Sequence, residues 1–414
     1  MRLLEVKVSN FKCDFSEILS KRVLKLEESP TFSLEKKVDE LDIELKREGN
    51  FVIRFGIGQP DFNTPENIKE AAKIAINENK TKYTASTGIK ELKLAIIGKL
   101  GRDNNIKYDL NNIFVGNGAK QVLDVIVRAF VNESDVVLVP KPYWATYTQQ
   151  VILSEGKPII VDCNSDLKLE INSLKEICTK FKSRIKLLIL NSPNNPTGVV
   201  YSKRELEEIG EVCLKNNIFI ISDEVYEKFI YGGALHYSIA SFSEDLKKIT
   251  ITVNAVSKTY AMTGWRIGYC AADEEIIKQM AKIQDQSASN PCTPAQWAAV
   301  EALNGSQSSI EVMRKEYEKR KNYIFERINK IKNVKCNLPL GAFYIFPDVS
   351  GLYNDKVKNS FDFASLLLEK GYVAVVPGGA FGDDRFVRIS YATPMGNIKE
   401  GMDRFEKFCN SLSS

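Results

Sequence analysis

Short apolar runs alternate with helical stretches through the middle of the chain, and this alternation most restricts the possible folds. From residue 113 onward the runs are IFVG, VVLV, PIIV, IKLLIL, IFIISD and ITITVN, all rich in Val and Ile. Strands of a parallel sheet have this composition because helices cover both faces of such a sheet. The pattern predicts an α/β fold with a mainly parallel sheet, and 414 residues are enough for two domains.

One of these runs leads into the segment SKTYAMTGWRIGY, which carries three groups with complementary chemistry. Ser257 offers a hydroxyl, Lys258 an amine and Arg266 a guanidinium. A phosphate suits the hydroxyl and the guanidinium, and a carbonyl suits the amine as a Schiff base. Pyridoxal 5′-phosphate (PLP) has both groups. A single lysine is more often a surface residue, but a Ser-Lys pair at a strand end followed by MTGWRIGY favours the cofactor.

Other polar residues follow predicted strands in the same way. Asp223 ends the strand before DEVY, which is where open α/β sheets bind ligands. A buried carboxylate needs a cation, and a protonated pyridine nitrogen is one. Asn195 follows another strand and can donate an amide hydrogen to a phenolic oxygen. The turn GNGAK, with Gly118 and Ala119, precedes a helix and is a weak signal for phosphate binding.

Composition excludes several other classes. The 57 basic and 53 acidic residues leave a charge of only +4, which does not argue for nucleic acid. Eight scattered cysteines without a CxxC pair predict reduced thiols in a cytoplasm, and a zinc site of the common kinds is not expected. His236 is the only histidine and reads as a loop residue, which argues against Ser-His-Asp hydrolysis. We find neither a signal peptide nor an apolar run long enough for a membrane span.

The motifs together resemble one family. SKTYAMTGWRIGY, YTASTGIKEL, NSPNNPTG, SDEVY, VVPGGAFG and RISYA are similar to the ordered motifs of the class I aminotransferases, most closely the I-gamma aspartate aminotransferase branch, and the resemblance runs from about residue 20 to the C-terminus. It implies fold type I of the PLP enzymes, a large α/β domain with a smaller α+β domain. It also implies a homodimer with shared active sites that moves the amino group of an L-amino acid to a 2-oxo acid.

The resemblance also implies roles for individual residues. Catalysis is carried by Lys258, which holds PLP and moves the proton, with Asp223 and Tyr226 tuning the ring. Cofactor binding is implied for Tyr83 (toward the other subunit's phosphate), Gly118, Ala119, Lys120, Trp144, Asn195, Asp223, Tyr226, Ser257, Lys258 and Arg266. Substrate binding is implied for Gly58, Lys120, Trp144, Asn195, Arg388, Ser29 and Thr31. Taken singly, Trp144 and Tyr83 would be packing residues and Arg388 a surface ion pair; their flanking motifs carry the assignment.

Substrate choice rests mainly on Lys120, which matches the lysine that the I-gamma aspartate enzymes use toward a distal acidic group. We therefore expect aspartate with 2-oxoglutarate. Gln59 stands where the family usually has Glu, which puts fine substrate geometry in doubt. An aromatic, kynurenine or alanine aminotransferase on the same scaffold is the alternative. A non-catalytic PLP-binding regulator is disfavoured because only about sixty residues precede the large domain.

Domain bounds follow from the change of character along the chain. Residues 1–62 are expected to form an arm and the first part of the small domain, 63–304 the large PLP-binding domain, and 305–414 the rest of the small domain. Near the N-terminus, Ser33 is a candidate helix N-cap and residues 51–57 read as a short strand.

Overall fold

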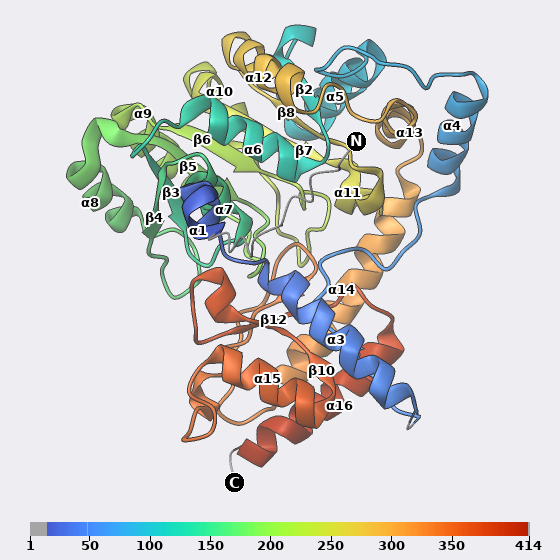
Figure 1. Cartoon of the computed structure of the whole chain (residues 1–414), viewed down its shortest axis with the longest axis vertical. Coiled ribbons are helices and arrows are strands. Elements are labelled where there is room, and N and C mark those ends of the chain that lie inside the picture. The colour runs from blue at the N-terminus through green and yellow to red at the C-terminus, as the bar shows by residue number, and fades with distance from the viewer. Residues whose placement is uncertain (1–14, 48, 413–414) are drawn as a thin grey trace, which may run out of the picture.

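The computed structural model describes residues 15–47 and 49–412, except for the side chains of residues 30–32, 46 and 47. Figure 1 shows an α/β part above a smaller part in which helices from both ends of the chain lie together. Of the predicted N-terminal arm, residues 1–14 lie outside the described residues. Every helix among the described residues is too short or too polar to cross a bilayer.

A seven-stranded sheet forms the centre of the upper part, in the order β2-β8-β7-β6-β5-β3-β4. Its strands are β2 (Ile113–Gly116), β3 (Val136–Pro140), β4 (Lys157–Val161), β5 (Ile185–Asn191), β6 (Phe219–Asp223), β7 (Thr250–Ala255) and β8 (Gly268–Ala271). β8 runs antiparallel to β2 and β7, and the other neighbouring pairs are parallel. The mainly parallel sheet predicted from the Val- and Ile-rich runs is confirmed.

Helices cover both faces of this sheet, and the period of two along each strand decides which face each side chain joins. In β5, Leu187 and Ile189 pack with the apolar residues of α6, whereas Leu188 and Leu190 pack with those of α8 and α9. The helices around the sheet are α4 (Glu66–Asn77), α5 (Lys90–Asn104), α6 (Ala119–Phe130), α7 (Thr146–Leu153), α8 (Ile171–Phe181), α9 (Lys203–Asn216), α10 (Glu244–Ile249), α11 (Val256–Thr259), α12 (Glu274–Ser287) and α13 (Thr293–Asn304). Helices therefore shield both faces of the sheet from water, as the apolar composition of its strands predicts.

The smaller part joins the two ends of the chain. Its helices are α3 (Pro30–Arg47), α14 (Ser308–Ile328), α15 (Ser360–Gly371) and α16 (Met395–Leu412), and its strands are β1 (Ile53–Arg54), β9 (Tyr344–Ile345), β10 (Val373–Ala374), β11 (Val376–Pro377) and β12 (Val387–Ser390). β1 pairs with β10 across more than three hundred residues of sequence, and β11, β12 and β9 form a separate antiparallel sheet. Figure 1 shows α3 lying beside this C-terminal part. The domain bounds stay a prediction.

Short elements complete the chain. They are the helices α1 (Phe15–Ile18) and α2 (Lys21–Leu24) and the 3-10 helices η1 (Leu110–Asn112), η2 (Lys182–Arg184), η3 (Ile239–Ser241), η4 (Thr263–Trp265), η5 (Ser350–Leu352) and η6 (Gly378–Phe381). α11 and η4 bracket the segment that begins with Ser257 and Lys258.

Two local predictions near the N-terminus are wrong. Ser33 does not cap α3, because the helix already begins at Pro30, a residue whose fixed φ suits a first turn. The Ser33 amide donates to the Ser29 carbonyl at 3.0 Å, and its hydroxyl donates to Glu28. The strand expected over residues 51–57 is limited to β1, since the backbone beyond it turns to other partners in the site described below.

Candidate active site

Lys258 lies where β7 ends and α11 begins, at the carboxyl edge of the sheet. Its Nζ donates a hydrogen bond of 2.6 Å to the carbonyl oxygen of Gly58. Burial, together with the positive charges of Arg388 and Arg266, lowers the pKa of the Lys258 amine to about 8, while Asp223 acts in the opposite direction. An amine that loses its proton near neutral pH is a nucleophile.

Asp223 ends β6 and is buried, as predicted. Its Oδ2 accepts a 2.7 Å hydrogen bond from the Tyr147 hydroxyl, and its Oδ1 accepts from the amide of Val225 at 3.3 Å. Burial raises the pKa of the Asp223 carboxyl to about 6, although both hydrogen bonds oppose the shift. A carboxyl whose pKa is raised by burial would gain from a cationic partner.

The glycine-rich turn before α6 packs directly against Arg266. Gly118 is the N-cap residue with φ of 83°, and a Cβ on it would lie 2.3 Å from an Arg266 guanidinium nitrogen. A Cβ on Gly268 would lie 2.2 Å from the amide nitrogen of Ala119. The guanidinium itself donates to the carbonyl of Asn117 at 3.1 Å. The positive end of a helix and an arginine therefore meet here, which is a favourable arrangement for an anion.

Arg388 lies on β12 and is buried, so it is not the surface ion-pair residue that a single arginine would more often be. It donates to the Asn195 side-chain oxygen at 3.0 Å and to the Gly56 carbonyl at 2.6 Å. Its Nε is buried without a hydrogen-bond partner among the described residues. A buried guanidinium that faces no carboxylate within the described chain is suited to a carboxylate ligand.

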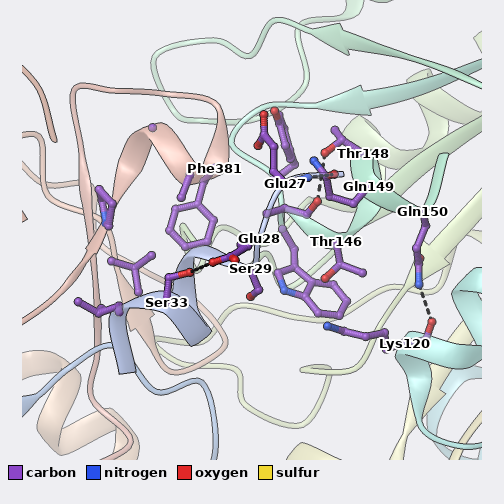
Figure 2. A pocket seen from close by; sticks show the side chains of 18 of the residues that line it. Glu27, Glu28, Ser29, Ser33, Lys120, Thr146, Thr148, Gln149, Gln150 and Phe381 are labelled. Carbon is purple, nitrogen blue, oxygen red and sulfur yellow. Dashed lines mark hydrogen bonds between the residues drawn. The ribbon is translucent and has the colours of Figure 1, made fainter. Parts of the chain in front are cut away.

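A cavity of about 1170 Å³ opens beside these groups. Figure 2 shows Lys120 on one side of it and Ser29 and Ser33 on the other. Trp144 and Arg266 also line it, and the Lys120 Nζ lies 4.9 Å from the centroid of the Trp144 ring. Burial lowers the pKa of the Lys120 amine, and the charge of Arg266 adds to the shift. Arg266 lies close to both Lys120 in the cavity wall and Lys258, and its positive charge lowers the pKa of both amines.

The structure brings most of the predicted residues together. Electrostatic interactions, hydrogen bonds or packing link Gly58, Gly118, Ala119, Lys120, Trp144, Asn195, Asp223, Tyr226, Lys258, Arg266 and Arg388 into one region. Ser257 is buried next to Lys258, and Ser29 reaches the region across the cavity. Tyr83 stands apart, with 91% of its surface exposed. The side chain of Thr31 lies outside the described residues.

Two tyrosines in this region were not predicted. Tyr147 binds Asp223, as described above, and Tyr344 on β9 has its hydroxyl oxygen 2.8 Å from that of Tyr226. These contacts join residues that are 76 and 118 positions apart. No short motif contains both partners, so only the position of Tyr147 within PYWATY and of Tyr344 within GAFYIF could have drawn attention to them.

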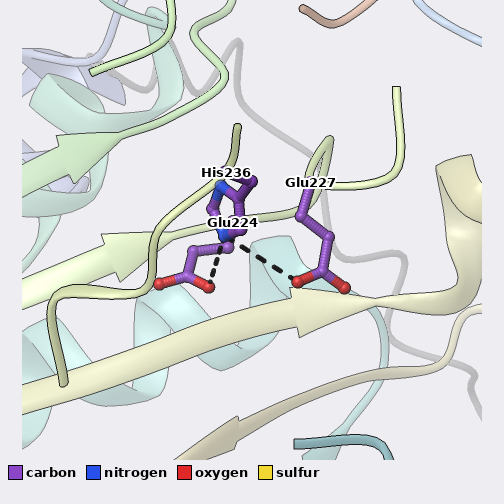
Figure 3. A group of neighbouring side chains, drawn as sticks. All are labelled: Glu224, Glu227 and His236. Carbon is purple, nitrogen blue, oxygen red and sulfur yellow. Dashed lines mark hydrogen bonds and ion pairs between the residues drawn. The ribbon is translucent and has the colours of Figure 1, made fainter. Parts of the chain in front are cut away.

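A second polar cluster lies just after the end of β6, and Figure 3 shows three of its side chains. His236 is a loop residue, as expected, and its Nε2 lies 3.0 Å from Glu224 and 3.9 Å from Glu227. The three side chains have the composition of a metal site. However, Lys99 forms an ion pair with Glu227, and Asn104 donates to both carboxylates. The cluster already contains its own cation, so its contacts are those of a closed polar network.

Comparisons with known proteins agree with this geometry. Residues 51–405 match the family model "Aminotransferase class I and II". The chain is 45% identical to the aspartate aminotransferase of Bacillus sp. (strain YM-2), over 95% of this chain and 99% of that protein. It is 46% identical to a probable aspartate/prephenate aminotransferase of Aquifex aeolicus, over 94% and 98%.

Solved structures give the same answer for the fold. The aspartate aminotransferase of Rhizobium meliloti superposes with a TM-score of 0.89 at 38% identity, covering 95% of this chain and 98% of that one. The expected fold of the large α/β part with its smaller companion is therefore confirmed. The chain belongs to the class I and II aminotransferase family and is an aminotransferase.

Proposed function

We propose that this aminotransferase binds PLP through Lys258 and moves the amino group of L-aspartate to 2-oxoglutarate. The cofactor proposal rests on the fit between its groups and the residues present. Arg266, Ser257 and the turn at Gly118 and Ala119 supply a cation, a hydroxyl and helix amides for a phosphate. Lys258, whose pKa burial lowers to about 8, supplies an amine for the carbonyl.

The ring end of the cofactor fits the other side of the region. Asp223 would pair with a protonated pyridine nitrogen, which would offset the burial that now raises its pKa to about 6. Tyr147 fixes one carboxylate oxygen of Asp223 and so orients the pair. Trp144 offers a ring for stacking, and Asn195 and Tyr226 offer donors for the phenolic oxygen. When bound, the cofactor supplies the electron sink of the reaction.

The chain's own residues then have three tasks. Arg388 holds the substrate α-carboxylate, and a planar two-point contact fixes the direction of the Cα–H bond. Lys258 would hold the cofactor through its amine and, when that amine is free, would act as the base that takes the proton from the substrate Cα and gives it back on the other side of the substrate nitrogen. The hydrogen bond that Lys258 makes to the Gly58 carbonyl would keep the free amine beside the segment that contains Gly58, one of the proposed substrate-binding residues.

Lys120 carries the proposal that the substrate is acidic. Its amine lies in the cavity wall, and no carboxylate pairs with it in the part of the chain that the structure describes. A distal substrate carboxylate would relieve the burial and the repulsion from Arg266 that lower its pKa. Ser29 lines the opposite wall, and Thr31 remains its proposed companion. The names of the relatives support aspartate and add prephenate to the substrates worth testing.

The alternative is an aromatic, kynurenine or alanine aminotransferase. The cavity of about 1170 Å³, with Trp144 and Phe381 in its wall, has room for a side chain much larger than that of aspartate. Because the cavity has this room, the experiment described below includes phenylalanine as a substrate. Relatives named as enzymes over nearly their whole length support catalysis and disfavour a non-catalytic regulator.

A homodimer with shared sites is part of the proposal. Tyr83 would reach the cofactor phosphate of the neighbouring subunit, and its 91% exposed side chain is free to do so. An aromatic side chain this exposed in one chain is consistent with a place at a subunit boundary.

The deciding experiment compares substrates in the amino-donating half-reaction. Purified protein with PLP receives aspartate, glutamate, alanine or phenylalanine, and loss of the lysine-bound cofactor absorbance gives kcat/KM. Lys120→Ala should lower kcat/KM for aspartate and glutamate by roughly 10–100-fold, because a charge-assisted hydrogen bond contributes about 1.5–3 kcal/mol. Alanine and phenylalanine have no distal charge and should lose much less.

Lys37→Ala is the matched control, since Lys37 also lines the cavity but comes from α3. It should leave the ratio between acidic and neutral substrates unchanged. An equal fall for every substrate in Lys120→Ala would make Lys120 a cofactor or structural residue and move the alternative ahead. A selective loss in Lys37→Ala alone would place the distal carboxylate on the opposite wall.

A further inference from the structure

Tyr344 is a buried phenol at which several segments of the candidate site meet. It lies on β9, and its partner in the neighbouring strand β12 is Ser390, two residues from Arg388. Resting on the proposed function, we propose that Tyr344 is a positioning residue that holds the Tyr226 hydroxyl so that its proton points to the phenolic oxygen of the cofactor.

The contact between the two phenols is short and well oriented. Their oxygens are 2.8 Å apart, and either can be the donor. Their rings meet edge to face, with centroids 5.6 Å apart and an interplanar angle of 80°. Two buried aromatic rings in this arrangement restrict each other's rotation. The Tyr226 hydroxyl is thus fixed by a partner that comes from the smaller part of the molecule.

Tyr344 also touches the neighbours of Tyr226. A Cβ on Gly58 would lie 2.6 Å from the Tyr344 hydroxyl, so the loop whose carbonyl accepts the Lys258 amine packs against this phenol. A Cβ on Gly198 would lie 3.0 Å from the Tyr344 carbonyl oxygen, in the turn that follows Asn195. The Arg388 guanidinium lies 4.6 Å from the centroid of the Tyr344 ring. A side chain at Gly58 would therefore press against the Tyr344 hydroxyl, while the Gly198 turn lies against the Tyr344 backbone.

The proton count gives Tyr344 its role. Tyr226 has one hydroxyl hydrogen, and it cannot serve both Tyr344 and a cofactor oxygen. If Tyr344 donates its own hydrogen to the Tyr226 oxygen, the Tyr226 hydrogen is left for the cofactor, and the chain of two bonds strengthens the second donor. Burial raises the pKa of both phenols, so both keep their hydrogens at working pH.

The consequence is visible in the absorbance of the lysine-bound cofactor. Donation to the phenolic oxygen favours the form in which that oxygen carries the charge, so the linked nitrogen loses its proton at lower pH. Tyr344→Phe keeps the ring and removes the donor. It should raise the midpoint of the pH-dependent absorbance change by about 0.3–1 pH unit. The net contribution of one hydrogen bond to the free-energy difference between the protonated and deprotonated forms has that size.

The experiment titrates the absorbance of the purified, PLP-loaded protein in wild type, Tyr344→Phe, Tyr226→Phe and the double variant. Tyr226→Phe should raise the midpoint at least as much as Tyr344→Phe. The double variant should match Tyr226→Phe, because Tyr344 acts through Tyr226. Tyr391→Phe is the control: it removes another buried hydroxyl of the same core cluster, which bonds to the Ala342 carbonyl. Its midpoint should equal that of wild type.

An unchanged midpoint in Tyr344→Phe, with a shifted one in Tyr226→Phe, would overturn this inference alone. Additive shifts in the double variant would do the same, since they would mean that Tyr344 acts on the cofactor independently. A wild type that gains no such absorbance with PLP would overturn the proposed function, and this inference with it. Thermal unfolding of each variant shows whether the fold is retained.

Discussion

At the scale of single residues, burial acts on two charged groups of the site in opposite directions. It lowers the pKa of the Lys258 amine to about 8 and raises the pKa of the Asp223 carboxyl to about 6. Both groups therefore change charge close to neutral pH. This follows from a low dielectric that disfavours the charged form of either sign. In the proposed function, a lowered pKa favours Lys258 as nucleophile and base, and a cationic partner would restore the charge that burial disfavours on Asp223.

Glu227 shows the opposite balance between burial and charge. Burial alone would raise the pKa of its carboxyl, but Lys99, helped by His236 and Lys228, lowers it to about 2. Because the folded pKa of about 2 lies below the ordinary value of 4.5, the stabilisation is present above that ordinary value and is lost as pH falls toward 2. The pair joins α5 to the segment that follows β6, which also carries Tyr226.

Breaking this pair should destabilise the protein strongly. Lys99→Met leaves the Glu227 carboxylate buried without its main cationic partner, and the expected loss is about 3–5 kcal/mol in the free energy of unfolding at pH 7. The double variant Lys99→Met with Glu227→Gln removes both charges and should recover most of that loss. Urea unfolding followed by circular dichroism measures the difference.

Lys330→Met is the matched control, because its pair with Glu326 is exposed on both sides. It should unfold at the urea concentration of wild type, within error. If Lys99→Met were no less stable than Lys330→Met, the ion pair between Lys99 and Glu227 would not stabilise the fold, which would contradict this prediction.

At the scale of elements, the sequence predicts the sheet well and the short elements poorly. β3 and β5 are nearly continuous apolar runs, and β6 and β7 are buried along almost their whole length although they also carry Ser, Thr, Asn and Asp, because both faces of the sheet are covered. The expected strand at residues 51–57 is limited to β1. Phe55 still bonds to the backbone of Ala374 and Ser390, but the Gly56 carbonyl accepts from Arg388 and, just past the expected strand, the Gly58 carbonyl accepts from Lys258. Local pattern cannot report such contacts.

The same limit explains which site residues were found. Lys258, Asp223 and Arg266 sit in ordered motifs that resemble a known family, so the sequence predicts them together. Tyr147 and Tyr344 act through partners on other elements, and nothing in their flanking residues marks the contact. Ser33 was misplaced as an N-cap because Pro30 starts α3 one turn earlier. Sequence motifs identify the residues proposed to contact a ligand more readily than the residues that hold those side chains in position.

At the scale of the whole molecule, the proposed homodimer can be tested through Tyr83. Tyr83→Phe should weaken cofactor retention roughly 10–100-fold, because it removes a hydrogen bond to a charged phosphate. Chains carrying Tyr83→Phe are then mixed with chains carrying Lys258→Ala and allowed to exchange subunits. If Tyr83 serves the neighbouring subunit, each heterodimer has one native site and one site with both changes. Activity at limiting PLP should therefore rise on mixing.

If Tyr83 served its own chain instead, each heterodimer would have two altered sites and mixing would restore nothing. Mixing wild type with Lys258→Ala provides the reference for one native site per heterodimer. A protein that sediments as a monomer at working concentration would remove the basis for the proposal.

The central claim is that Lys258 carries the cofactor, and trapping with borohydride tests it most directly. Borohydride reduces the carbon–nitrogen bond between PLP and its lysine, so the label survives digestion and mass analysis of the peptides. The account predicts the added mass on the peptide that contains Lys258, and its absence from that peptide in Lys258→Ala, which should still bind PLP noncovalently. A label on another lysine in the wild type, or full turnover by Lys258→Ala, would contradict the account.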